Sequence, residues 1–317
     1  MTVFDGHSDL LYDVVRRRLA GETEVLKRHH LEALRAGHIG GLGLSLWVTA
    51  KSGDFWPAAW DGWQRTEAML AAARAELAES PWLVPVRTAE AARAAMAEGK
   101  VFAFLAIEGM EPMGDRLDRL EQYAQWGARL GMLTWNEENL LAVGAGGDPR
   151  RGLTPLGRET VRRMQTLNIL PDVSHAADGT FWDILDLTAG PVVASHSNCR
   201  ALCDVRRNLT DDQLRAIRDT GGVVGVNVHH AFVHADPQRQ TVAMLARHAA
   251  HMAEVMGVEH VACGFDFCQY FGPGNEGCRG MEDCAQTGNF LLELERLGFS
   301  EGERRAIAME NLLRVLG

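Results

Sequence analysis

The 317-residue sequence lacks the features that mark several classes of protein. It has no apolar run long enough to span a bilayer, and no basic segment followed by the short apolar stretch of a secretion signal. The formal net charge is −10 and the basic residues form no long run, which argues against nucleic acid or an anionic membrane surface as a partner. From these absences we expect a cytoplasmic protein that binds neither nucleic acid nor membranes.

Cysteine is scarce and its spacing is uninformative. The six cysteines form no C-x-x-C pair, and so few thiols in a long chain without a secretion signal are expected to stay reduced. The sequence also has no repeat at the period of solenoid proteins. Because no G-x-G-x-x-G turn follows the first apolar run, a doubly wound, dinucleotide-binding sheet is disfavoured as the competing architecture.

What is present is an alternation of short β-rich apolar runs with helical stretches rich in Ala, Leu, Arg and Glu. Eight strand–helix units of roughly 40 residues each fit a (β/α)8 barrel, in which helices cover a parallel sheet. No Ser- or Gly-rich linker divides the chain, so we predict an α/β fold, a (β/α)8 TIM barrel, as a single domain over residues 1–317. The eight runs are residues 2–9, 40–48, 101–109, 130–136, 169–175, 191–197, 221–229 and 260–267.

Polar residues gather at the ends of these runs, where a barrel places its active site. Side chains at positions i and i+2 of a strand point to the same face, so His7 and Asp9 can bind one cation together. His175 and His196 end neighbouring strands, which lie about 4.8 Å apart, and can share a second cation. The polar strand-end residues are His7, Asp9, Glu108, Trp135, Asn136, His175, His196, Asn227, His229 and Asp266.

Glu108 lies between the two groups in the strand order, and the two oxygens of a carboxylate can bridge two metals. Ligands of this N and O type suit Zn²⁺, with Mn²⁺, Co²⁺ or Fe²⁺ as substitutes. Each residue also has an ordinary interpretation. A single strand-end histidine such as His229 more often makes a structural hydrogen bond, and the histidines in helical or loop contexts are expected at the surface. These are His29, His30, His38, His234, His248 and His251.

Taken in order, the motifs resemble the membrane dipeptidase (renal dipeptidase) family, zinc metallopeptidases with amidohydrolase-like barrels. The resemblance implies a barrel with two zinc ions, of which His7, Asp9 and Glu108 bind one and Glu108, His175 and His196 bind the other. The matching pieces run the length of the chain: DGHSDLL, FLAIEG, LTWNEENLLAVGA, GLTPLGRETVRRMQTLNILPDVSH, VVASHSNCRAL, RRNLTDDQLRAI, GGVVGVNVH, GFDF and ENLLRVLG.

Many related amidohydrolases bridge their metals with a carboxylated lysine instead of a glutamate. The lysines of this chain are Lys27, Lys51 and Lys100, and none of them ends a predicted strand at the barrel mouth. Glu108 is therefore the expected bridge.

The resemblance also implies that the protein hydrolyses the peptide bond of dipeptides, with L-D dipeptides among the candidate substrates. A hydroxide that bridges the metals attacks the carbonyl, and Asp266 matches the family's general acid/base. Arg207 matches the arginine that binds the substrate carboxylate, a task that suits a planar guanidinium. The alternative for Arg207 is a surface ion pair with Asp211 or Asp212. A homodimer is compatible with the resemblance.

Three positions depart from the family pattern. Trp135 stands where renal members have a histidine thought to stabilise the oxyanion, and neighbouring Asn136 is a candidate for sharing that role. Phe232 stands where a tyrosine near the substrate carboxylate is expected, and Cys268 replaces the second aspartate of a DFD motif. Two further hypotheses therefore stay open: an amidohydrolase acting on another amide or ester, such as an N-acyl amino acid or a lactone, and a non-catalytic metal-binding barrel.

Two loops are expected to shape the pocket, because loops at the barrel mouth carry most of the variation among barrel enzymes. Residues 50–63 are rich in aromatic side chains. Residues 268–284 are rich in glycine and could close as a lid.

Overall fold

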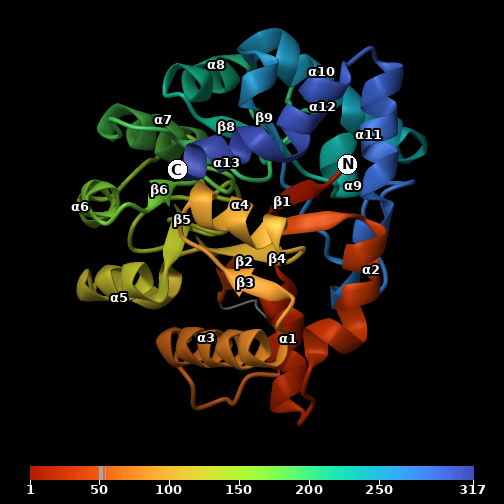
Figure 1. The fold of residues 1–317 in the computed structure, drawn as a ribbon. Coiled ribbons are helices and arrows are strands. Elements are labelled where there is room, and N and C mark those ends of the chain that lie inside the picture. The colour runs from red at the N-terminus through yellow and green to blue at the C-terminus, as the bar shows by residue number, and fades with distance from the viewer. Residues whose placement is uncertain (50–52, 54) are drawn as a thin grey trace.

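The computed structural model describes residues 1–49, 53 and 55–317, and shows helices arranged around a curled sheet (Figure 1). The strands are β1 (Val3–Ser8), β2 (Ile39–Trp47), β3 (Leu83–Pro85), β4 (Val101–Glu108), β5 (Ala128–Met132), β6 (Leu170–Pro171), β7 (Val193–Ala194), β8 (Val223–Val226) and β9 (Val261–Cys263). The α-helices are α1 (Leu10–Leu19), α2 (Leu31–Ala36), α3 (Gly62–Glu79), α4 (Ala89–Ala97), α5 (Asp118–Trp126), α6 (Pro155–Thr166), α7 (Asp178–Leu187), α8 (Asp211–Asp219), α9 (His230–Val233), α10 (Val242–Met256), α11 (Thr287–Arg296), α12 (Glu301–Arg305) and α13 (Asn311–Leu316).

The strands form a parallel sheet that returns to its first strand. Two hydrogen-bonded sections run in the orders β1-β2-β4-β5-β6 and β7-β8-β9. A parallel bridge between Asp172 and Val193 joins the sections. On the other side, the backbone N–H of Asp266, just beyond β9, donates to the carbonyl of His7 in β1 over 3.3 Å. Each of the eight predicted runs overlaps a strand, and the predicted (β/α)8 barrel is confirmed.

Strand β3 was not predicted from the sequence. It pairs with the first half of β4, with Leu83 opposite Val101, whereas β5 pairs with the second half, with Leu105 opposite Ala128. A strand of three residues that ends in proline is too short to give a period-two signal. The sheet is therefore split beside the middle of β4, where one neighbouring strand ends before the next begins.

The barrel interior is filled by alternate residues of the strands. Phe102, Phe104 and Ala106 of β4 share a core cluster with Phe4 of β1, whereas Ala103 and Ile107 belong to the cluster that includes the surrounding helices. Because neighbouring residues of a strand face opposite sides, Glu108 continues the inward-facing row at the carboxyl end of β4.

The carboxyl-terminal helix α13 closes the other end of the barrel. Leu312, Leu313 and Leu316 pack in the same cluster as the inward-facing phenylalanines, and α13 lies across the strands in Figure 1. The barrel thus has one sealed end and one open end, and the open end is where the strand-end polar residues lie.

Two of the helices begin at threonine caps. The Thr154 side chain accepts from the backbone N–H of Gly157, with Pro155 in the first turn, and Thr210 forms a capping box with Gln213. Within the described residues, no helix is both long enough and apolar enough to cross a membrane.

Candidate metal centre and active site

The five side chains predicted to bind metal meet at the open end of the barrel. All five residues are buried, with exposed fractions of 5% or less. Glu108 lies at the centre and its two oxygens face different partners. Oε2 is 3.1 Å from Nε2 of His7, while Oε1 is 2.9 Å from Nε2 of His175 and 4.0 Å from Nε2 of His196. One oxygen of Glu108 is thus available to a first group that contains His7, and the other to a second group that contains His175 and His196.

The spacing within each group suits a shared cation. In the first group, Nε2 of His7 is 3.7 Å from Oδ1 of Asp9 and 3.9 Å from Oδ1 of Asp266. In the second group, the Nε2 atoms of His175 and His196 are 3.0 Å apart. Ligands about 2.0–2.2 Å from a tetrahedral zinc ion are separated by about 3.3 Å from one another. The observed separations are close to this value.

The electrostatics of the site also favour a bound cation. Burial and the nearby charge of Asp266 raise the pKa of Glu108 to about 8, and burial and Glu108 raise the pKa of Asp9 well above its usual value. Burial lowers the pKa of His175 and His196 well below the usual value, which keeps both imidazoles neutral as metal binding requires. A divalent cation would compensate the buried carboxylates, so the residues present fit such an ion.

Hydrogen bonds behind the histidines hold their rings in place. Oδ1 of Asn136 lies 3.0 Å from Nδ1 of His175, and Oγ of Ser195 lies 2.8 Å from Nδ1 of His196. Each contact engages Nδ1 and leaves Nε2 facing the centre, as is usual for metal-binding histidines. The amide oxygen of Asn136 thus faces His175, a contact that could not be predicted from the sequence.

Asp266 follows β9 with a φ of 60°, an uncommon backbone conformation for a residue other than glycine. Its Oδ2 accepts a hydrogen bond of 3.0 Å from Nδ2 of Asn227, and its Oδ1 is the oxygen that faces His7. Backbone strain of this kind tends to occur at functional sites. The carboxylate therefore has one anchored oxygen and one oxygen directed at the metal-binding cluster.

Arg207 is buried beside the histidines, with 8% of its surface exposed. It donates to the carbonyl of Ser174, its Nη2 is 3.2 Å from Nε2 of His175, and its guanidinium lies 5.4 Å from the centre of the Phe232 ring. Burial lowers the pKa of Arg207 to about 10.

The alternative interpretation of Arg207, a surface ion pair with Asp211 or Asp212, is wrong. Asp211 pairs with His251 and Asp212 pairs with Arg215, both at 2.8 Å.

A pocket of about 400 Å³ opens above these groups. Its wall includes most of the predicted site residues, whereas His7 and His196 are fully buried. The loop after β9 contributes Cys268, Phe271 and Asn275, and the loop after β2 contributes Gly53; residues 50–52 and 54 of that predicted pocket loop lie outside the described residues. The pocket is lined by Asp9, Tyr12, Trp47, Gly53, Glu108, Trp135, Asn136, His175, Arg207, His229, Phe232, Asp266, Cys268, Phe271 and Asn275.

His229 lines the pocket, although the sequence favoured a structural hydrogen bond for this residue. Its ring stacks on Phe232 with centroids 4.5 Å apart, and its buried Nδ1 has no hydrogen-bond partner within the described part of the chain. Its place after β8, in the same strand-end position as the other site residues, was the signal that could have identified it. It is available to contact a bound molecule.

Comparisons with known proteins agree with this geometry. A sequence model of the membrane dipeptidase family, peptidase family M19, matches residues 1–317. An uncharacterised protein encoded in the pqqA 5′ region of Klebsiella pneumoniae is 36% identical over 229 residues, which cover 69% of this chain and 83% of the relative. An uncharacterised dipeptidase of Schizosaccharomyces pombe is 28% identical over 341 residues, which cover 99% of this chain and 80% of the relative.

Solved structures share the fold over the whole chain. The crystal structure of a metallopeptidase described as dipeptidase AC has a TM-score of 0.88 and 27% identity, covering 100% of this chain and 98% of its own. A metallopeptidase from Rhodobacter sphaeroides, liganded with a phosphinate mimic of the dipeptide L-Ala-D-Ala, has a TM-score of 0.87 with the same identity and coverage. The chain therefore belongs to the membrane dipeptidase family, peptidase family M19, and is a metallopeptidase of the dipeptidase type.

Proposed function

We propose that the protein is a binuclear zinc dipeptidase. His7, Asp9 and Glu108 would hold one ion, and Glu108, His175 and His196 the other. The observation that carries the proposal is the position of Glu108, whose Oε2 faces His7 at 3.1 Å and whose Oε1 faces His175 at 2.9 Å. A carboxylate placed in this way has one oxygen for each of two cations.

The side chains around the cluster have separate tasks in this proposal. Two zinc ions would polarise the scissile carbonyl and lower the pKa of the attacking water toward neutrality. Oδ1 of Asp266 takes the proton of that water and returns it to the leaving amine, while Asn227 holds Oδ2. Arg207 binds the terminal carboxylate of the substrate through its guanidinium.

The size of the pocket and the position of Arg207 favour short substrates. A pocket of about 400 Å³ is at the small end of ligand sites, which span roughly 300–1,000 Å³. A carboxylate clamp close to the scissile bond leaves no room for further residues on the carboxyl side. Because the Rhodobacter sphaeroides enzyme binds a mimic of L-Ala-D-Ala, we include L-D dipeptides among the proposed substrates.

This chain departs from the family pattern at Trp135, the position expected to stabilise the oxyanion. The indole of Trp135 offers one N–H donor and carries no charge. Since the amide oxygen of Asn136 faces His175, His229 is the better-placed candidate for this contact. Trp135 also favours a second candidate function, the hydrolysis of N-acyl amino acids, which carry the same carboxylate for Arg207.

Metal analysis of the purified protein tests the proposal. We expect close to two zinc ions per chain, a lower content in Glu108→Gln, and full metal content with loss of turnover in Asp266→Asn. Absence of metal, with no activity gained on adding Zn²⁺ or Mn²⁺, would overturn it. Unchanged binuclear occupancy in Glu108→Gln would refute the bridge.

Substrate specificity needs a separate experiment. Turnover of L-L and L-D dipeptides, compared with N-acyl amino acids of the same carboxyl-terminal residue, distinguishes the two candidate functions. The cytoplasmic location and the homodimer stay predictions. Light scattering of the metal-loaded protein tests the homodimer.

A further inference from the structure

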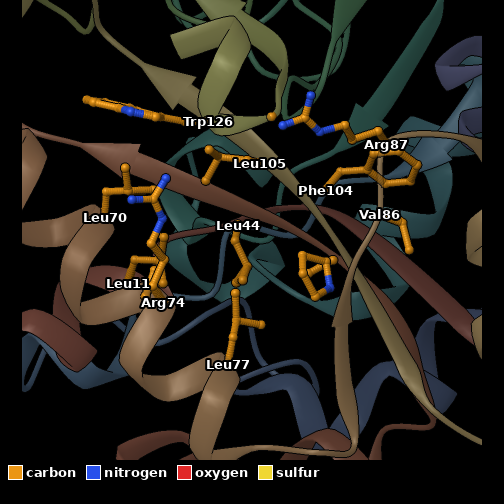
Figure 2. A pocket seen from close by; sticks show the side chains of 14 residues that line it. Leu11, Leu44, Leu70, Arg74, Leu77, Val86, Arg87, Phe104, Leu105 and Trp126 are labelled. Atoms are coloured by element: carbon orange, nitrogen blue, oxygen red, sulfur yellow. The ribbon is translucent and has the colours of Figure 1, made fainter. Parts of the chain in front are cut away.

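A second cavity, of about 250 Å³, lies on the outer wall of the barrel under α3 (Figure 2). It opens at the split in the sheet, where β3 has ended and β5 has just begun to pair with β4. Leu44 of β2 and Leu105 of β4 are paired in register and both contribute to its wall. None of its lining residues belongs to the pocket above the metal-binding cluster.

The wall of this cavity is mainly aliphatic. Leu70, Ala73 and Leu77 line it from α3, and Leu11 lines it from α1. The small side chains of Ala73 and Ala103 leave space where a larger residue would fill the gap between helix and sheet. Such a lining favours an apolar guest, because polar groups placed there would lose their hydrogen bonds to water.

Two arginines stand at the mouth. Arg74 projects from α3 and Arg87 from the segment after β3, on different sides of the cavity in Figure 2. Both residues are exposed, and neither forms an ion pair with an acidic side chain of the described residues. Arg87 donates one hydrogen bond of 2.7 Å, to the carbonyl of Gln125.

We propose that this cavity binds a medium-chain aliphatic carboxylate, with the chain among the leucines and the carboxylate between Arg74 and Arg87. The size fits, because 250 Å³ holds roughly eight water-sized groups at about 30 Å³ each. The charge fits as well, because a guanidinium binds a carboxylate through paired hydrogen bonds. In a chain with a net charge of −10, two exposed arginines that have no acidic partner among the described residues, beside an apolar opening, match an anion with an apolar tail.

Calorimetric titration of octanoate into the metal-loaded enzyme tests the proposal. We expect one site per chain, with 1-octanol binding at least about tenfold more weakly because it lacks the charge. The double variant Arg74→Gln/Arg87→Gln should weaken octanoate binding by about tenfold or more, and Leu77→Trp should abolish it by filling the cavity. Arg116→Gln, an exposed arginine paired with Asp118, is the matched control and should bind as the parent does.

Octanoate could also bind at the metal centre, and the variants separate the two sites. Binding that survives Leu77→Trp does not belong to this cavity and would overturn the proposal, as would the absence of saturable binding. Equal affinity for octanol and octanoate, together with unchanged binding in the arginine variant, would refute the role of the carboxylate. Dipeptidase activity should be the same in every variant, and circular dichroism checks that Leu77→Trp is folded. The arginine variant changes only exposed groups, so it remains an independent test.

Discussion

At the scale of single residues, the side-chain amide of Asn227 orients the carboxylate of Asp266, the proposed general acid/base. Asn227 is fully buried, donates from Nδ2 to Asp266 over 3.0 Å, and accepts the backbone N–H of His229 at 2.7 Å. Its own backbone is paired with the side chain of Asn198. Asn227 therefore has a fixed orientation, and it fixes the orientation of the Asp266 carboxylate in turn.

Replacing Asn227 by aspartate should lower kcat while leaving the metal content unchanged. The variant keeps the acceptor for His229 but exchanges the donor for a second carboxylate, which repels Asp266. Loss of a hydrogen bond to a charged group is worth about 1.5–3 kcal/mol, or roughly 10- to 100-fold in rate. Steady-state kinetics should show this in kcat with KM little changed. A change confined to KM would contradict the positioning role.

His248 shows that a histidine in a helix can be structural and deeply buried. The sequence indicated a surface position for His248 and for His30, and both predictions are wrong. In α10, Nε2 of His248 donates to the carbonyl of Val233 at 2.8 Å, and Nδ1 accepts the backbone N–H of Cys199 at 3.1 Å. Burial, with minor repulsion from His251 and His234, lowers the pKa of His248 to about 4.

This histidine should make the protein less stable in mild acid. The folded state keeps His248 neutral down to about pH 4, whereas the unfolded chain binds the proton near pH 6.5. The free energy of unfolding is therefore unaffected by the titration of His248 above pH 6.5. It decreases as the pH falls toward 4, by about 2 kcal/mol between pH 7 and pH 5. Urea unfolding of the parent and of His248→Gln at both values measures it. An equally steep fall in the variant would contradict the assignment.

At the scale of elements, a buried carboxylate joins α3 to the turn that precedes α2. Glu76 is fully buried and accepts the backbone N–H groups of Val25 and Leu26, each at 3.0 Å. It also pairs with Arg18 of α1 at 2.5 Å. These contacts satisfy donors at the start of the π-helical turn η1 (Leu26–His30), which α-helical hydrogen bonding leaves free.

Glu76→Gln should destabilise this corner of the molecule. The amide keeps the shape but loses the charge that two backbone donors and Arg18 share, for a cost of about 1–3 kcal/mol. Hydrogen exchange of residues 25–31 should become faster. Glu79→Gln is the comparison, because Glu79 contacts the same arginine and accepts one backbone N–H, that of Glu24, from a side chain that is 31% exposed. Its cost should stay below about 1 kcal/mol.

At the scale of the whole molecule, the two ends of the barrel have separate roles. Helix α13 fills the closed end with leucines, and the polar residues occupy the open end, as in other barrel enzymes. Stability and catalysis should therefore respond to different substitutions.

Leu313→Ala should reduce stability without affecting the reaction. Leu313 is fully buried in the barrel cluster, and deleting such a side chain costs about 2–5 kcal/mol through lost burial and the cavity left behind. Denaturant unfolding measures the loss, and kcat at a temperature where both proteins are folded should be unchanged. Leu292→Ala, at a leucine that is 52% exposed, is the control and should cost little. A fall in kcat with unchanged stability would contradict the separation of the two ends.

The sequence by itself determined the barrel and the kinds of residue in its site. Alternation of apolar runs and helices is a local property, and the polar residues that end those runs could be identified without knowing what they touch. Strand β3 escaped because three residues are too few for a periodic signal. Strands β6 and β7 are shorter still, with two residues each, but they were predicted because each lies within a longer apolar run.

The tertiary structure alone decided which atoms meet. Glu108 and His7 are 101 residues apart in the chain, and the 3.1 Å between them depends on strand order, register and the turn of each side chain. The contact of Asn227 with Asp266, the burial of Arg207 and the cavity under α3 arise in the same way. Local sequence fixes periodicity because it acts between neighbours, whereas a site joins residues distant in the chain and exists only once the barrel has brought them together.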